Sequence, residues 1–327
     1  MKILSFNMEN LDDKSSTYNP DLNTRAPILR AELLRADADI ICLQEIHGQE
    51  TSAHTSNNPD RILSALDEVL AGTPYAQYEK VVTKTTDNTP YNERNLVILS
   101  RYPVNRHEQY KNDHIEKLQY KRVTADPAEN DAKNIRWERP ILHAEIQVNA
   151  NTVVHVINLH LKSKLASSIA GQKNGFEWES AAGWAEGYFL SSLKRVGQAL
   201  ETRILVDKIL DQDANANIVV CGDFNAEPGE VPAEAIQGRV ENTNNPDLRH
   251  RSLVPCSHHI PESMRYSHLH HGHGNLLDHM MISQNLIAHF QQAQIFNENL
   301  HDESLPFAFD LKYPESDHAA FVAEFNL

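Results

Sequence analysis

The sequence has few cysteines and no long apolar run. Its three cysteines, Cys42, Cys221 and Cys256, are an odd number without CxxC spacing, so we expect neither a disulfide framework nor a cysteine-based zinc site. No apolar stretch approaches the roughly 20 residues that a membrane-spanning helix needs. The N-terminal MKILSFNMEN has too short an apolar run for a signal-peptide core. We therefore expect a cytoplasmic protein, or a secreted one if a signal peptide was removed from a longer precursor.

Positive charge is also scarce. The 327 residues include 30 Lys and Arg against 45 Asp and Glu, which gives a formal net charge of −15. This balance argues against a protein that wraps nucleic acid with a broadly basic face, because polyanions need a positive footprint. It is compatible with a local basic cleft, or with an enzyme whose bound cations reverse the sign at the active site. The 18 histidines favour metal-assisted chemistry, since imidazole is both a metal ligand and a proton carrier.

Neither an internal repeat nor a Gly-, Ser- or Pro-rich linker divides the chain, so we expect one domain over residues 1–327. Residues 24–45 and 195–225 share one plan, in which a helix and a polar turn lead into a buried strand with a polar end. Further strands are expected within residues 2–7, 95–100, 139–146, 151–161, 276–283 and 318–325. Several are continuous apolar runs, which is typical of strands covered on both faces. The pattern predicts an α/β fold with packed sheets.

Two segments, residues 105–135 and 165–190, look irregular or insertional. The second is rich in aromatic residues, and two of them, Trp184 and Tyr188, have helical i, i+4 spacing. The aromatic residues form either an apolar patch that packs on the body or a lid that faces the substrate.

Polar side chains end the predicted strands. They are Asn7, Glu45, Asn158 with His160, Asp223 with Asn225, Asp278, and Asp317 with His318. One polar residue at the end of a buried strand is unremarkable, but six strands that end in Asn, Asp, Glu or His form a constellation. Catalytic and ligand-binding groups collect at such ends because the sheet fixes their positions.

The residue types indicate a chemistry. Glu45, Asp317 and Asn7 offer hard oxygen ligands that suit Mg²⁺ or Mn²⁺ rather than zinc. Asn158 and His160 have period-two spacing, so they share one face of their strand together with Lys162. An amide, an imidazole and an ammonium on one face suit an anionic phosphate. Asp278 and His318 suggest an imidazole oriented by a carboxylate for acid–base work. Together they would serve the hydrolysis of a phosphate ester.

The motifs SFNMEN, ICLQE, NLVILSRYP, NLHLKSK, CGDFN, LLDHMMIS and SDH occur in this order between Asn7 and His318. In this the sequence resembles the endonuclease/exonuclease/phosphatase superfamily, which includes pancreatic-type deoxyribonucleases, apurinic endonucleases, neutral sphingomyelinases and inositol polyphosphate 5-phosphatases. The resemblance implies a four-layer α/β/β/α sandwich of two packed mixed sheets flanked by helices. Singly, LQE or SDH is a weak signal, but the ordered set is specific.

The resemblance also implies roles for individual residues. Asn7, Glu45 and Asp317 resemble the divalent-metal region, with Glu45 as principal ligand. Asp223 resembles the carboxylate that orients or deprotonates the attacking water, and Asn225 resembles a contact to a phosphate oxygen. His160 and His318 resemble the imidazoles that flank the scissile phosphate, and Asp278 the residue that polarises His318.

Two further residues are carried over from branches of the family. YNERNLVILSRYP is similar to the deoxyribonuclease branch, in which a glutamate before this strand pairs with the first histidine. Glu93 is therefore the candidate partner of His160. Arg139 resembles an arginine that many bacterial members place before a strand, near the phosphate, and Asn158 is the remaining candidate for phosphate binding.

These observations favour a hydrolase of phosphodiester bonds that depends on Mg²⁺ or Mn²⁺, and in particular a nuclease with nucleic acid as its partner. No obligate protein partner is evident. One alternative is a hydrolase of small or lipid phosphoesters, which the acidic charge favours. A non-catalytic relative is the other, but no metal carboxylate or histidine is missing.

The His-rich stretch 258–279 contains seven histidines and a turn marked by two glycines. We expect a loop there. One alternative is a second metal site. Another is that His271 or His273 reaches the substrate.

Overall fold

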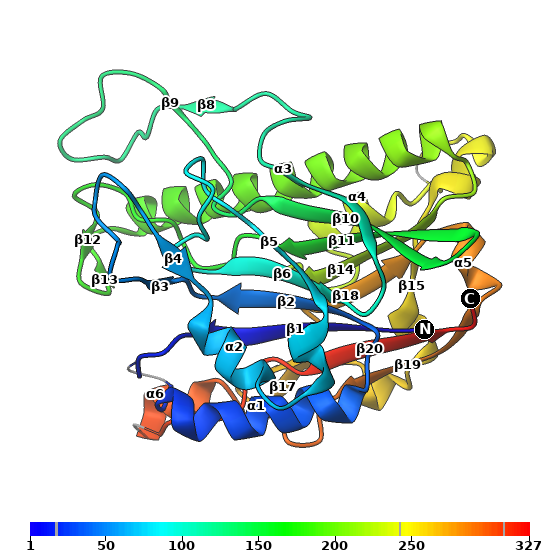
Figure 1. Ribbon diagram of the computed structural model, residues 1–327. Coiled ribbons are helices and arrows are strands. Elements are labelled where there is room, and N and C mark those ends of the chain that lie inside the picture. The colour runs from blue at the N-terminus through cyan, green and yellow to red at the C-terminus, as the bar shows by residue number, and fades with distance from the viewer. Residues whose placement is uncertain (17–18, 242, 310) are drawn as a thin grey trace.

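Two six-stranded sheets pack face to face at the centre of the computed structural model, which describes residues 1–16, 19–241, 243–309 and 311–327 (Figure 1). The first sheet has the order β19 (Phe290–Phe296), β20 (Ala320–Phe325), β1 (Lys2–Leu11), β2 (Ile40–Ile46), β6 (Asn95–Ser100) and β5 (Glu79–Val82). The second has the order β15 (Val254–Pro255), β18 (Asp278–Ile282), β14 (Asn217–Asp223), β11 (Thr152–His160), β10 (Ile141–Asn149) and β7 (Val104–Tyr110).

One parallel strand pair lies in each sheet, and each explains half of the two-fold plan in the sequence. β1 pairs with β2 so that Asn7 lies opposite Gln44, and β11 pairs with β14 so that His160 lies opposite Asp223. Parallel neighbours need a crossover. A helix lies between the strands of each pair along the chain: α1 (Leu22–Ala36) between β1 and β2, and α3 (Ala181–Gln212) between β11 and β14.

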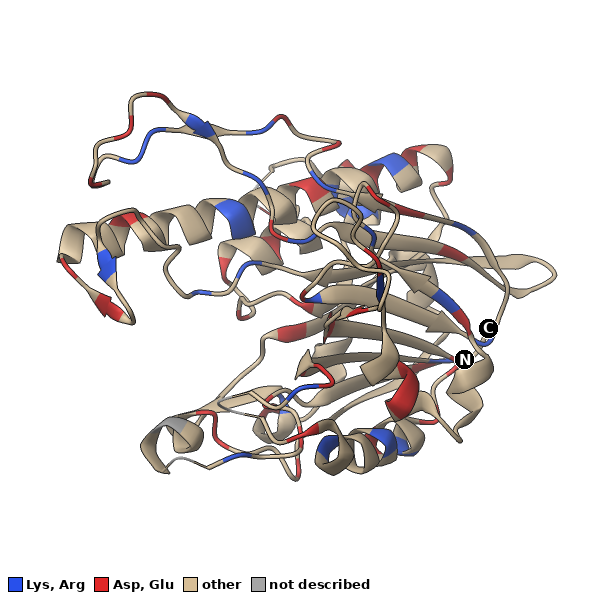
Figure 2. Cartoon of the chain, turned by 60° about the vertical axis from the view of Figure 1, so that its left-hand side comes forward, with Lys and Arg blue, Asp and Glu red and all other residues tan. Residues whose placement is uncertain are grey.

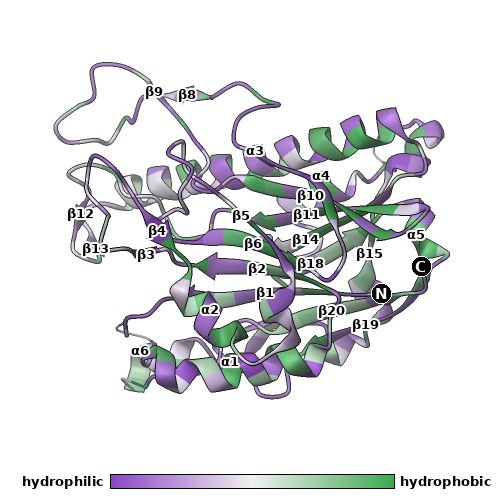
Figure 3. Cartoon of the chain, in the orientation of Figure 1, coloured by the Kyte–Doolittle hydropathy of each residue, from purple (hydrophilic) through white to green (hydrophobic). Residues whose placement is uncertain are grey.

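The apolar strands are buried on both faces, as their sequences indicate. Between the sheets, side chains such as Ile3, Ile98, Val156 and Val219 form one buried cluster. The outer face of the first sheet packs on α1 and α2 (Ser64–Leu70), and that of the second packs on α3 and α4 (Val231–Gln237). Figure 3 shows the apolar residues along the strands. The structure therefore confirms the four-layer α/β/β/α sandwich.

Short elements connect the layers. Two-stranded ribbons are formed by β3 (Gln49–Glu50) with β4 (Arg61–Ile62), β8 (Gln119–Tyr120) with β9 (Lys133–Asn134), β12 (Lys173–Asn174) with β13 (Glu177–Trp178), and β16 (His268–His270) with β17 (His273–Asn275). The remaining helices are α5 (Gln284–Ile287), α6 (Ser304–Phe309) and the 3₁₀ turns Pro74–Gln77, Pro246–Arg251, Cys256–His259 and Glu262–Met264. In the described part of the chain, no helix is both long and apolar enough to cross a membrane.

The two segments expected to be irregular are more ordered than predicted. β7 occupies residues 104–110, and α3 begins at Ala181, where the Ser180 hydroxyl caps it by accepting a hydrogen bond from the Gly183 amide at 2.9 Å. The expected helical spacing of Trp184 and Tyr188 is present, and their rings stack at 5.5 Å. Both side chains are about half exposed and Phe176 is 90% exposed, whereas Trp178 of the same segment packs against the buried cluster around Trp137.

Candidate active site

The polar strand ends meet at one edge of the sandwich, on the left in Figure 1. β1, β2, β11 and β14 end there, while β6, β18 and β20 begin there, because their partners run antiparallel to them. Sequence-distant residues are brought together in this way. Asn7, where β1 leaves its register with β2, donates from its amide to Asp223 at the end of β14, at 3.2 Å and across 216 residues of chain.

Asp223 lies at the centre of the site and is 2% exposed. Its carboxylate accepts hydrogen bonds from the Asn225 backbone amide at 2.8 Å and from the Asn225 side-chain amide at 2.9 Å. The His160 Nε2 atom lies 3.3 Å from the same carboxylate. Burial, reinforced by the charge of Asp278, raises the pKa of Asp223 to about 7. A carboxyl with such a pKa can exchange protons near neutral pH.

The glycine of the CGDFN motif is required by the approach of β14 to β11. Gly222 has φ 131°, and a Cβ atom there would lie 2.0 Å from the Leu159 carbonyl oxygen. A side chain at this position would therefore displace the strand that carries Asp223.

Asp278 and His318 form a close pair. The Asp278 Oδ2 atom lies 2.7 Å from His318 Nδ1, and His318 Nε2 lies 4.0 Å from Asp223. Burial disfavours the charged imidazole, but the carboxylates of Asp278 and Asp317 outweigh it and raise the pKa of His318 well above its ordinary value. The pair thus presents a protonated ring nitrogen on the side of Asp223, as a carboxylate-oriented imidazole should.

His160 has the opposite character, although it lies beside two carboxylates, with its Nε2 atom 3.4 Å from Glu45 and 3.3 Å from Asp223. Burial, followed by the nearby charges of Arg139 and Arg94, lowers its pKa well below the ordinary value. The site therefore combines a neutral imidazole and a charged one. Titratable groups whose pKa values are pushed apart in this way are typical of acid–base sites.

A second group of carboxylates, Glu9, Glu45 and Asp317, lies next to these residues. Asn10 donates its backbone amide to Glu45 at 2.9 Å, and Asp317 donates its amide to Glu9 at 3.0 Å. Burial and mutual repulsion raise the pKa of Glu9 well above its ordinary value, and burial also raises that of Asp317. Glu45 has φ 62°, an uncommon backbone conformation for a side-chain-bearing residue, of the kind that clusters at functional sites.

Arg25 of α1 supports this group and had no signal in the sequence pattern. Its guanidinium donates to the carbonyls of Met8 and Glu9, both at 2.9 Å, where β1 bulges out of register with β2. A buried cation on the helix therefore fixes the bulge that carries Glu9, and it offsets part of the carboxylate repulsion.

A sequence model described as "Endonuclease/Exonuclease/phosphatase family" matches residues 4–318. The chain belongs to this family. Its members are generally phosphoester hydrolases that depend on divalent metal ions. No match was found among curated proteins.

Solved structures with the same fold cover this chain completely. The 3′ phosphatase NExo from Neisseria, bound to a product DNA hairpin, has a TM-score of 0.54 at 16% identity and is covered over 100% of its length. Truncated TDP2 of Caenorhabditis elegans has a TM-score of 0.55 at 16% identity with 97% covered, and an AP endonuclease from Archaeoglobus fulgidus has 0.51 at 15% with 100% covered. At sequence identities this low, the structural similarity establishes the fold alone.

The donor set fits the divalent metal that the family implies. Asp317 Oδ1 is buried and makes no hydrogen bond with any described residue, and His318 Nε2 lies 3.9 Å from it. A hard cation at Asp317 would satisfy this orphaned oxygen and offset the repulsion from the nearby carboxylates of Glu45 and Glu9. Among the described residues, the ligand atoms that lie within 4.8 Å of Asp317 and of one another are those of His268 and Glu303. Glu9 was not among the sequence candidates, although it stands two residues after Asn7 in the first motif.

Asn158 differs from its predicted role in phosphate binding. Its side chain donates to the carbonyls of Leu43 and Val97 at 3.0 and 3.1 Å and accepts from Gln44 at 2.7 Å. The face that Asn158 shares with His160 points at the opposite sheet rather than at solvent. Asn158 is therefore a fully buried tie between the two sheets, and its hydrogen-bonding groups are all used there.

Glu93 also differs from its predicted role as the partner of His160. Its side chain is exposed, and His160 Nδ1 makes no hydrogen bond within the described residues. Its neighbour Arg94, at φ 57°, instead turns toward the site, where its Nε atom donates to Asn10 at 3.4 Å and its charge acts on His160. The segment before β6 thus brings a cation to the site.

Arg139 lies beneath the site and holds the end of β11. Its guanidinium donates to the carbonyls of His160 and Leu161 at 3.0 and 2.9 Å. It therefore positions His160 through the backbone, and its charge helps to lower the pKa of that imidazole.

The His-rich stretch is not a simple loop. Two 3₁₀ turns and the β16–β17 ribbon occupy much of it. His268 reaches the site: its Nε2 atom lies 3.1 Å from Glu303, and its ring centre lies 5.4 Å from that of His318. His271 and His273 are exposed on the ribbon.

Proposed function

We propose that this protein hydrolyses phosphodiester bonds in nucleic acid with the help of Mg²⁺ or Mn²⁺. The observation that carries the proposal is the meeting, at one sheet edge, of a buried carboxyl with pKa about 7, a protonated imidazole and a crowded carboxylate group. This combination supplies a base, a cationic hydrogen-bond donor and a metal-binding set, which are the parts that phosphoester hydrolysis needs.

Each side chain then has a role. Asp223 accepts a proton from a water molecule as the water oxygen bonds to phosphorus, and the ester oxygen leaves with the electrons of the P–O bond and takes a proton from solvent. His318, held protonated by Asp278, and His160 steady the phosphoryl oxygens, and Asn225 holds the carboxylate of Asp223 in place.

The metal has one place in this scheme. Glu45 and Asp317 would hold it, with Asn7 and Glu9 nearby, and it would neutralise charge on the phosphate in the transition state. Arg94 and Arg139 add fixed positive charge around His160.

A panel of substrates tests the proposal. The purified protein, with Mg²⁺ or Mn²⁺, is offered single-stranded and plasmid DNA, RNA, bis-p-nitrophenyl phosphate and sphingomyelin, beside the Glu45→Gln and His318→Ala variants. We expect cleavage of nucleic acid and of the small diester by the wild type, and its loss in both variants. No turnover of any substrate would refute the proposal, and equal activity in His318→Ala would refute the site.

The alternative is a hydrolase of small or lipid phosphoesters. The net charge of −15 favours it, because a polyanion is repelled at long range. Turnover of sphingomyelin or of the small diester without cleavage of nucleic acid would select it.

A further inference from the structure

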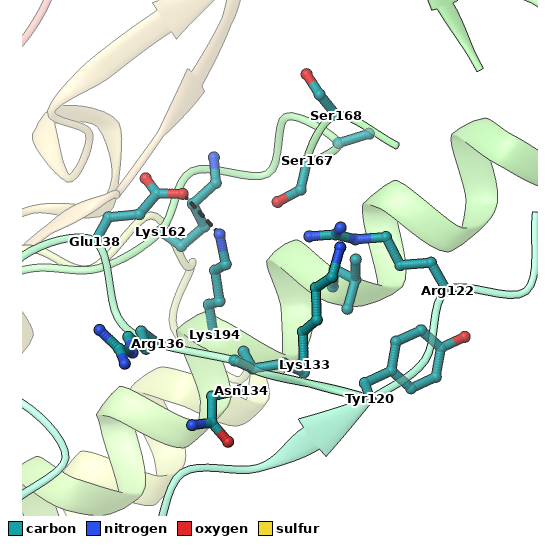
Figure 4. A pocket seen from close by; sticks show the side chains of 13 residues that line it. Tyr120, Arg122, Lys133, Asn134, Arg136, Glu138, Lys162, Ser167, Ser168 and Lys194 are labelled. Atoms are coloured by element: carbon teal, nitrogen blue, oxygen red, sulfur yellow. Dashed lines mark hydrogen bonds and ion pairs between the residues drawn. The ribbon is translucent and has the colours of Figure 1, made fainter. Parts of the chain in front are cut away.

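A basic pocket lies beside the candidate active site, although the chain as a whole is acidic. Its lining combines five cationic side chains with a single carboxylate, that of Glu138. The cations are Arg122, Lys133, Arg136, Lys162 and Lys194. The pocket has a volume of about 490 Å³, and Figure 4 shows the amines of Lys133, Lys162 and Lys194 directed into it.

The walls of the pocket come from two chain segments. One wall is the excursion from β7 to β10, which carries β8 and β9, and the other is the N-terminal half of α3 with the segment before it. Figure 2 shows basic segments on the excursion and on α3 beneath it. Outside this region Asp and Glu outnumber Lys and Arg even more strongly than in the whole chain, so the pocket is a local reversal of charge.

Buried carboxylates of α3 fix the excursion in place. Glu186 accepts hydrogen bonds from the Val123 and Thr124 amides at 2.6 and 2.9 Å, and Glu201 accepts them from the Asp113 and His114 amides at 2.6 and 3.0 Å. Charge-assisted bonds of this kind are stronger than neutral ones. The pocket is therefore a built feature of the fold rather than a gap beneath a loose loop.

The pocket is next to the candidate active site, because two of its lining residues adjoin residues of that site. Lys162 stands two residues after His160, and its charge contributes to the low pKa of that imidazole. Glu138 is the neighbour of Arg139, which holds the carbonyl of His160. A chain that leaves the scissile phosphate in this direction would meet the cations next.

The cations are incompletely neutralised. Lys194 pairs with Glu138 at 3.0 Å, and Lys133 and Arg122 both pair with Glu129, at 2.7 and 2.8 Å. Arg136 and Lys162 make no ion pair within the described residues, and burial with nearby cations lowers the pKa of Lys162. Bound anions would stabilise this arrangement, because they would offset the repulsion.

We infer that this pocket binds the phosphates that follow the scissile one along a single nucleic-acid strand, and so selects an extended strand over a small phosphodiester. This inference rests on the proposed function. It adds that the phosphates beyond the scissile one distinguish the substrate from a small phosphodiester. Cations beyond the scissile phosphate increase affinity for a substrate that carries further phosphates. The pocket is concave and walled on both sides, which suits a flexible strand rather than the flat surface of a lipid bilayer.

The test neutralises one cation on each wall. Lys133→Gln/Lys194→Gln is compared with Lys117→Gln/Lys208→Gln, which removes the same charge from the same loop and the same helix. Lys208 stands 14 residues after Lys194, roughly 21 Å further along the helix. Circular dichroism and Tm show that both variants are folded.

Binding is measured by fluorescence anisotropy with a labelled single-stranded DNA of 12 nucleotides, in EDTA, over a series of salt concentrations. We expect the pocket variant to bind about ten-fold more weakly than the wild type at low salt, with the slope of log K against log[salt] smaller by about 1.4. The control variant should retain the wild-type slope. Equal effects in the two variants, no binding of DNA by the wild type, or binding of anionic vesicles in its place would each overturn the inference.

A second measurement separates this inference from the proposed function. With Mg²⁺, kcat/KM for bis-p-nitrophenyl phosphate should be equal in wild type and both variants, because this diester has no further phosphate. Turnover of the diester with no DNA-binding difference between the variants would leave the hydrolase standing and remove the strand-binding pocket. Weaker DNA binding in the pocket variant, with no turnover of the diester by the wild type, would support the strand-binding pocket and refute the hydrolase.

Discussion

Replacing Asp223 by Asn should change how stability depends on pH. The folded-state pKa of this carboxyl is about 7, whereas an aspartate in an unfolded chain titrates near 3.9. Between these values the folded protein holds a proton that the unfolded chain has released, so the free energy of unfolding of the wild type falls as pH rises. The neutral amide of the variant removes this contribution.

The magnitude follows from the shift. One pKa unit corresponds to about 1.4 kcal/mol, so the wild type should lose roughly 2 kcal/mol through this group between about pH 5.5 and pH 8. The variant also loses hydrogen bonds, because an amide donor would face the side-chain amides of Asn7 and Asn225. That cost is nearly independent of pH, and it cancels when the difference between variant and wild type at the two pH values is compared.

The assay is urea unfolding of both proteins in EDTA at the two pH values. Relative to the wild type, Asp223→Asn should gain about 2 kcal/mol at the higher pH. Asp87→Asn makes the same chemical change at an exposed carboxyl and serves as control. A variant-to-wild-type difference that is the same at both pH values would refute the reasoning, because it would mean that burial does not raise the pKa of Asp223.

Three further predictions concern activity and metal binding. In Asp278→Asn the pKa of His318 should fall, since the Asp278 carboxylate holds it high, so the alkaline limb of the pH–rate profile moves to lower pH; an unchanged limb would contradict this. Glu93→Gln should change kcat/KM by less than about two-fold, because the Glu93 side chain is exposed. A large loss of kcat/KM would instead support the pairing of Glu93 with His160 that the resemblance implies. Mg²⁺ at roughly 100 times its Kd should stabilise the wild type by about 2.7 kcal/mol, which a melting curve shows as a higher Tm. Glu45→Gln should show little of this Tm shift on addition of Mg²⁺. An equal Tm shift in both proteins would mean that the metal binds elsewhere.

Much of the fold could be predicted because its signals are local. Continuous apolar runs mark strands covered on both faces, and β1, β2, β6, β11 and β14 lie where the sequence places them. The beginning of α3 at Ala181 was harder to predict, because its first turns carry Gly183, Gly187 and exposed aromatic residues rather than an apolar stripe.

Some residues of the candidate site could also be predicted from the sequence, whereas their contacts could not. Asn7, Asp223, Asp278 and His318 could be named from polar residues at strand ends, and the structure brings them together. The direction in which a side chain points depends on tertiary contacts. Asn158 faces the other sheet for this reason and ties the sheets together instead of facing a substrate.

The sequence by itself determined the fold class, the family and the end of the sheets where the chemistry lies, because these depend on periodicity and on the order of motifs. The tertiary structure alone decided which neighbours those side chains have. It placed Arg94 rather than Glu93 toward the site, joined Glu9 to Glu45 and Asp317, and gathered five cations of a −15 protein into one pocket. The physical reason is that charge and burial act through space, and the residues that set them lie far apart along the chain.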